Sequence, residues 1–150
     1  MNQSPPAGLT SESESATDLV DVVLLNRDLF FGVRVANTLR GLGYRVTVCK
    51  ETSTFSDRVR TATLAPVLGI LDLTAVDDWD AIRELTSDPS VETPLLLFGA
   101  HKDVAGLRAA KAAGVDRVVS NGDFHREMVT LVRRYARPTG APSGGADVQS

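Results

Sequence analysis

The chain has 150 residues, of which 43% are hydrophobic and 23% are charged, with a formal net charge of −3. This length and apolar content suit one domain with a single core, and the mixed charge gives no reason to expect nucleic acid or a membrane as a partner. The single cysteine, Cys49, excludes an internal disulfide and fits a reducing compartment. No apolar run approaches the roughly 20 residues that span a bilayer and no secretion signal is evident, so we expect a cytoplasmic protein.

Apolar spacing and capping residues predict five strands that alternate with five helices. The strands are expected at 21–25, 44–49, in the apolar run from Pro66 that ends at Asp72, at 95–98 and at 115–119. The helices are expected to begin at Asp28, at Ser53 or Thr54, at Asp77-Asp78, at Asp103 and at Asp123, and to end near Gly41, Leu64, Ser87, Gly114 and Tyr135. Residues 1–19 and 138–150 have the composition of a disordered and a flexible tail, around a domain of residues 20–137.

Strands and helices in strict alternation, joined by short loops, are typical of a doubly wound α/β fold with a parallel sheet. The second strand alternates between polar and apolar residues, which places it at an edge. Right-handed crossovers then favour the flavodoxin-like order 2-1-3-4-5, with helices on both faces. In this order Asp72, at the end of the third strand, lies beside the three residues that follow the first strand, namely Asn26, Arg27 and Asp28. Gly99 and Asn121 should close the site from the other side.

Five stretches, in this order and spacing, resemble the receiver domain of response regulators over about residues 20–137. They are Val22–Leu25, Gly41–Val46, Leu68–Leu73, Pro94–His101 and Ala113–Asp116. The resemblance implies that Asp72 is the equivalent of the phosphoacceptor. For an isolated Asp, by contrast, the residue pattern favours a role as a cap of the next turn.

The resemblance also implies a set of partner residues, most of which this chain lacks. Two acidic residues normally hold a divalent cation after the first strand, and here Asn26 and Arg27 stand in their place, with Asp28 one residue later as a helix cap. The switch hydroxyl is replaced by Gly99 and the aromatic switch residue by Val118. The lysine at the end of the fifth strand is replaced by Asn121.

These departures favour a pseudo-receiver, a signalling module that works by protein–protein interaction, independently of phosphorylation, with no enzymatic activity and no cofactor. In this interpretation Arg27 pairs with Asp72 and stands in for the metal. One alternative is a phosphoacceptor in a two-component phosphorelay, which would need Mg²⁺; another is a small-anion or ligand sensor centred on Arg27. The expected partner is another protein, such as a histidine kinase or a downstream signalling protein, or a second copy that docks on the fourth helix, fifth strand and fifth helix.

Overall fold

The computed structural model describes residues 20–138, and both expected tails lie outside this range apart from Pro138. Five strands are present: β1 (Val20–Leu25), β2 (Tyr44–Cys49), β3 (Leu68–Asp72), β4 (Leu95–Gly99) and β5 (Arg117–Ser120). They alternate with α2 (Leu29–Gly41), α3 (Thr52–Thr61), the short 3₁₀ helix η1 (Leu73–Ala75), α4 (Trp79–Ser87), α5 (Val104–Ala112) and α6 (Asn121–Tyr135).

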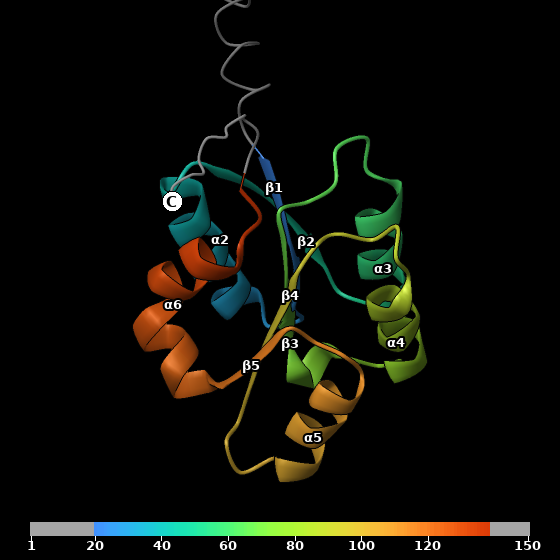
Figure 1. The fold of residues 1–150 in the computed structure, drawn as a ribbon. Coiled ribbons are helices and arrows are strands. Elements are labelled where there is room, and N and C mark those ends of the chain that lie inside the picture. Colours follow the sequence, from blue (N-terminus) through green and yellow to red (C-terminus); the bar gives the residue numbers. More distant parts are fainter. Residues whose placement is uncertain (1–19, 139–150) are drawn as a thin grey trace, which may run out of the picture.

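The strands form one parallel sheet in the order β2-β1-β3-β4-β5, which confirms the predicted flavodoxin-like topology. Helices α2 and α6 cover one face of the sheet, and α3, α4 and α5 cover the other (Figure 1). Strands β1 and β3 are buried on both sides, so their alternate residues contribute to two cores, one on each face of the sheet, in place of the single core expected. One core holds Val23, Leu25 and Leu71, and the other holds Val22, Leu24 and Ile70.

Three of the five predicted helix starts are confirmed, each at an aspartate that caps the helix. Asp28, Asp78 and Asp103 each accept a backbone hydrogen bond at the start of α2, α4 and α5. Two helices end before a glycine with positive φ, Gly43 (φ 98°) and Gly114 (φ 89°), a conformation that favours glycine.

The other two helix starts and the last strand differ from the predictions. Helix α3 begins at Thr52 after Glu51, which makes no side-chain cap, and it ends at Thr61 rather than near Leu64. Strand β5 runs to Ser120, and the hydroxyl of Ser120 accepts a hydrogen bond from the backbone N–H of Asp123. Because Ser120 takes the capping role, Asn121 and Gly122 belong to the first turn of α6 and do not form a turn before it.

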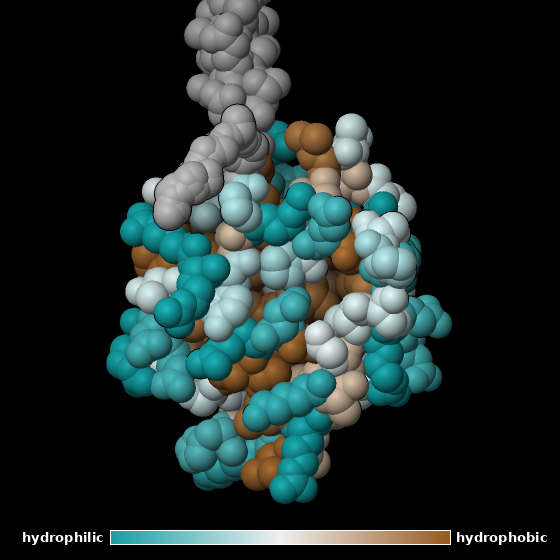
Figure 2. All heavy atoms as spheres, in the orientation of Figure 1, coloured by the Kyte–Doolittle hydropathy of each residue, from teal (hydrophilic) through white to brown (hydrophobic). Residues whose placement is uncertain are grey.

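Most of the surface turned to the viewer in Figure 2 is hydrophilic, and apolar atoms show mainly in the middle, between the two helical layers. Within residues 20–138, no helix combines the length and the apolar character needed to cross a membrane.

Candidate functional site

Asp72 is the last residue of β3 and lies at the carboxyl edge of the sheet, where only 8% of the residue is exposed. Its carboxylate accepts three hydrogen bonds from the chain itself. Oδ1 accepts from the backbone N–H of Thr74 at 2.9 Å and from the Thr74 hydroxyl at 2.8 Å. Oδ2 accepts from Nδ2 of Asn26 at 2.8 Å. Asp72 therefore caps the 3₁₀ turn, as an Asp at such a position often does.

Asn26 is almost fully buried, with 2% exposed, and connects the ends of β1, β2 and β3. Its backbone N–H donates to the carbonyl of Cys49 at 2.9 Å. An ionised carboxylate can only accept, so the amide must turn Nδ2 toward Asp72 and Oδ1 away from it. Oδ1 faces Gly32 of α2, where an added Cβ would lie only 2.9 Å from it. The amide oxygen, the one side-chain atom of Asn26 that could bind a cation, therefore points away from the carboxylate.

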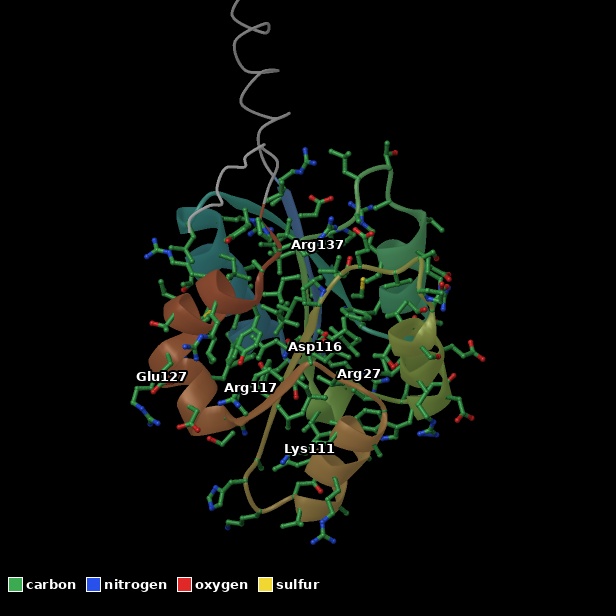
Figure 3. The ribbon with its side chains drawn as sticks, viewed as in Figure 1. Arg27, Lys111, Asp116, Arg117, Glu127 and Arg137 are labelled. Atoms are coloured by element: carbon green, nitrogen blue, oxygen red, sulfur yellow. The ribbon has the colours of Figure 1, made fainter. Side chains whose placement is uncertain are left out.

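Arg27 does not pair with Asp72, so the predicted Arg27–Asp72 ion pair is wrong. Its Nε donates to the carbonyl of Lys50 at 2.9 Å, and its Nη2 lies 2.9 Å from Oδ2 of Asp77. Arg27 is labelled in Figure 3. Asp77 is held in turn by its backbone N–H, which donates to the hydroxyl of Thr52 at 3.0 Å.

The alternation of side chains along β1 explains this direction. Asn26 continues the phase of Val22 and Leu24, which face α2 and α6, and Asp72 shares that side of the sheet. Arg27 continues the phase of Val23 and Leu25 and therefore leaves the strand toward the layer of α3 and α4.

The space beside Gly99 and Gly106 is filled by Leu73, which is 93% buried. A Cβ added to Gly99 would lie 2.6 Å from Cδ2 and 2.8 Å from Cβ of Leu73. A Cβ added to Gly106, in the first turn of α5, would lie 2.8 Å from the same Cδ2. Both glycines thus let Leu73 occupy the space between β4 and α5.

The remaining predicted positions are not brought to the carboxylate by any hydrogen bond or ion pair among the described residues. Asp28 accepts from the backbone N–H of Phe31 at 3.0 Å and caps α2. Val118 is half-buried against the core on the side of α5, and Asn121 is exposed. Ser120 lies opposite Gly99 in the sheet register, although its hydroxyl caps α6.

These residues do not fit a divalent cation. Mg²⁺ requires several oxygen ligands in near-octahedral geometry. Here Asp72 offers a carboxylate, Asn26 presents N–H to it, Asp28 caps α2, and Asp77 is bound to Arg27. Within the described part of the chain, no group of three or more His, Cys, Asp or Glu side chains could hold a metal ion.

Thr74, Asp77 and Leu73 shape this site, and the sequence reasoning missed all three. An Asp followed two residues later by Thr is a signal for a local side-chain turn, so the bonds of Thr74 could have been predicted. No comparable signal marks Asp77 or Leu73, because their roles depend on contacts with β1, β4 and α5.

The chain resembles known proteins in sequence and in fold. No family model matches the chain. The transcriptional regulatory protein ZraR of Klebsiella oxytoca is 26% identical over 119 residues, which cover 78% of this chain and 26% of that protein. The chain thus spans about a quarter of the length of this curated relative.

Solved structures of similar fold include a protein described as a response regulator from Chloroflexus aurantiacus, with a TM-score of 0.68 and 18% identity, covering 79% of this chain and 98% of that one. The chemotaxis response regulator CheY4 of Vibrio cholerae has a TM-score of 0.65 and 14% identity, covering 78% and 98%. The resemblance based on the sequence motifs is confirmed: the chain has the fold of the response-regulator receiver domain.

Proposed function

We propose that this receiver-type domain transmits a signal by binding another protein, without phosphorylation of Asp72 and without enzymatic activity. The observation that carries the proposal is the bonding of Asp72, whose carboxylate is held by Asn26 and Thr74 of the same chain. The proposed place of action is the cytoplasm, and the proposed partner is a kinase or a downstream signalling protein.

Transfer of a phosphoryl group to Asp72 would have to overcome several deficits. The acceptor needs a cation to neutralise phosphate and carboxylate charge, and interactions of this kind are each worth several kcal/mol. Turning the Asn26 amide to offer oxygen would leave its N–H groups facing Gly32 and would remove the bond to Asp72. Breaking a buried hydrogen bond to a charged group costs about 1.5–3 kcal/mol.

The packing of Leu73 supports a single fixed conformation. A receiver that switches needs a side chain on β4 that follows the phosphoryl group, and Gly99 has none. Leu73 fills that space between β4 and α5, so the two elements are held together by apolar contact that no phosphate controls. A partner would then bind one fixed surface, and its binding would not depend on a change between two conformations.

Exposed apolar side chains support a protein partner. Phe30 and Leu29, at the start of α2, are exposed over 82% and 70% of their surface, and Val104 at the start of α5 is also exposed. Val104 lies on the α5–β5–α6 side, where we propose that a second copy could dock. The anion sensor centred on Arg27 is less favoured, because Asp77 already neutralises that guanidinium.

The test is an amide NMR titration of the full chain with Mg²⁺ and beryllofluoride, a mimic of the phosphorylated aspartate. We expect no saturable shift at Asp72, Gly99 or α5. The same titration is repeated on Asn26→Asp/Arg27→Asp, which places two carboxylates after β1. A response only in this variant would show that the metal site is what the unmodified chain lacks, and no response in either would show that the switch residues are missing as well. A saturable response in the unmodified chain would overturn the proposal and favour the second candidate, a working phosphoacceptor at the end of β3.

A further inference from the structure

A groove follows the free edge of the sheet, and one end of it reaches Asn26, which bonds Asp72. Strand β2 is outermost in the sheet order, so within residues 20–138 no strand pairs with its outer edge. Two hollows lie along it. One, of about 320 Å³, lies between α2 and the carboxyl end of β2, and the other, of about 460 Å³, follows residues 43–47. Arg40 lines both, so the two hollows are neighbours along β2, and together they are called the groove.

The floor of the groove is apolar and open. Leu29, Val33 and Ala36 line it from one face of α2, and Val48 lines it from β2. Val33 and Val48 remain exposed over 50% and 43% of their surface. A free strand edge beside exposed apolar side chains favours pairing with another segment, and natural proteins usually cover such an edge.

The rim of the groove is basic. Among the described residues that line it, five are cations, Arg27, Arg40, Arg45, Lys50 and Arg58, and two are carboxylates, Asp21 and Asp28. Asp28 caps α2, and Asp21 is shared between two arginines, Arg45 at 2.9 Å and Arg58 at 3.6 Å. Arg27 is bound by Asp77, outside the groove, while Arg40 and Lys50 make no ion pair with a described residue. The groove therefore favours an acidic occupant.

We propose that this occupant is the chain's own segment of residues 1–19. The segment carries three acids, Glu12, Glu14 and Asp18, and neither lysine nor arginine. It joins β1 at Val20, which lies opposite Tyr44 in the sheet register, and Tyr44 lines the groove. The segment is therefore attached next to the groove, and its negative charge complements the basic rim.

Length and tethering favour the same assignment. Nineteen extended residues reach about 60 Å, while the six residues of β2 span only about 20 Å. A short tether gives an effective concentration in the millimolar range, so weak contacts suffice for occupancy. A second copy of the chain would instead bring two basic rims together, which costs free energy.

The test compares amide spectra of two full-length variants at low salt. Glu12→Gln/Glu14→Gln/Asp18→Asn removes the three charges of the segment. Glu84→Gln/Glu127→Gln/Asp147→Asn removes three charges elsewhere and is the matched control, because Glu84 and Glu127 are exposed and make no ion pair with a described residue. We expect the first variant to shift the amides of Tyr44–Lys50, Val33 and Arg40, and the control to leave them in place.

Salt and a groove variant complete the test. Raising salt from about 0.1 M to about 1 M shortens the Debye length from about 10 Å to about 3 Å and should move the unmodified chain toward the first variant. Arg40→Gln/Lys50→Gln should change the amides of residues 9–18. Unchanged β2 amides, or equal shifts in the control, would overturn the proposal. Shifts that grow with protein concentration would assign the groove to a second copy and would overturn it as well.

Discussion

Leu73 fills the space beside Gly99, which we propose as the position of the missing switch side chain, and a double-mutant cycle tests this packing directly. In Gly99→Thr, the new Cβ would lie 2.6 Å from Cδ2 and 2.8 Å from Cβ of Leu73, well inside van der Waals contact. Overpacking of this kind costs about 1–3 kcal/mol. Leu73→Ala alone should cost about 2–5 kcal/mol, because it leaves a cavity at a residue that is 93% buried.

The double variant should cost less than the sum of the two single variants, by about 1–3 kcal/mol, since threonine refills the space that leucine leaves. Urea unfolding followed by circular dichroism measures the four free energies of unfolding. Gly41→Thr is the matched control, because a Cβ added there meets no atom within 4 Å, and it should be additive with Leu73→Ala. Additivity at Gly99 would refute the claim that Leu73 fills the space beside it.

Three further predictions concern the bonding and titration of single side chains. Asn26→Ala should lower the free energy of unfolding by about 1.5–3 kcal/mol, because Asp72 loses a buried bond; no loss in urea unfolding would contradict this. Burial raises the pKa of the Cys49 thiol, so a thiol reagent at neutral pH should react slowly with the folded chain and rapidly in denaturant; equal rates would argue against burial. Hydrogen bonds from Ser90 lower the pKa of Asp88 from 3.8 to about 2, so Asp88 should stabilise the fold above about pH 4 and lose this effect as the pH falls through about 2. The difference in stability between Asp88→Asn and the unmodified chain should therefore shrink with acidification, and a constant difference would count against this pairing.

The fold was predictable because its local signals agree with one another. The apolar runs of β3 and β4 are too short for buried helices, and the half-polar β2 could only lie at an edge. The caps Asp28, Asp78 and Asp103 each stand directly before the first apolar residue of a helix, so these helix starts were predictable. The prediction was wrong where two capping residues compete, as at α6, since Ser120 and Asp123 are both good caps. Strand β5 ends at Ser120, which lies opposite Gly99 in the sheet register.

The candidate site was predictable in position but not in its contacts. Asp72 and Asn26 meet because one ends β3 and the other follows β1, and these strands are neighbours in the sheet order. The direction of Arg27 could have been inferred from side-chain alternation, since it is in phase with Val23 and Leu25. The partner of Arg27 could not have been inferred. Asp77 comes within reach of Arg27 because the η1 turn and the hydrogen bond to Thr52 hold its loop beside β1.

The measurement that tests the central claim most directly is intact-mass spectrometry of the full chain after incubation with Mg²⁺ and a small phosphodonor such as acetyl phosphate. Asp72→Asn serves as the control, because it removes the acceptor and keeps the size of the side chain. The structure predicts no gain of a phosphoryl group in either protein, since Asn26 and Thr74 hold the carboxylate and the surrounding residues do not fit a cation. A phosphoryl group gained by the unmodified chain and absent from Asp72→Asn would contradict the account.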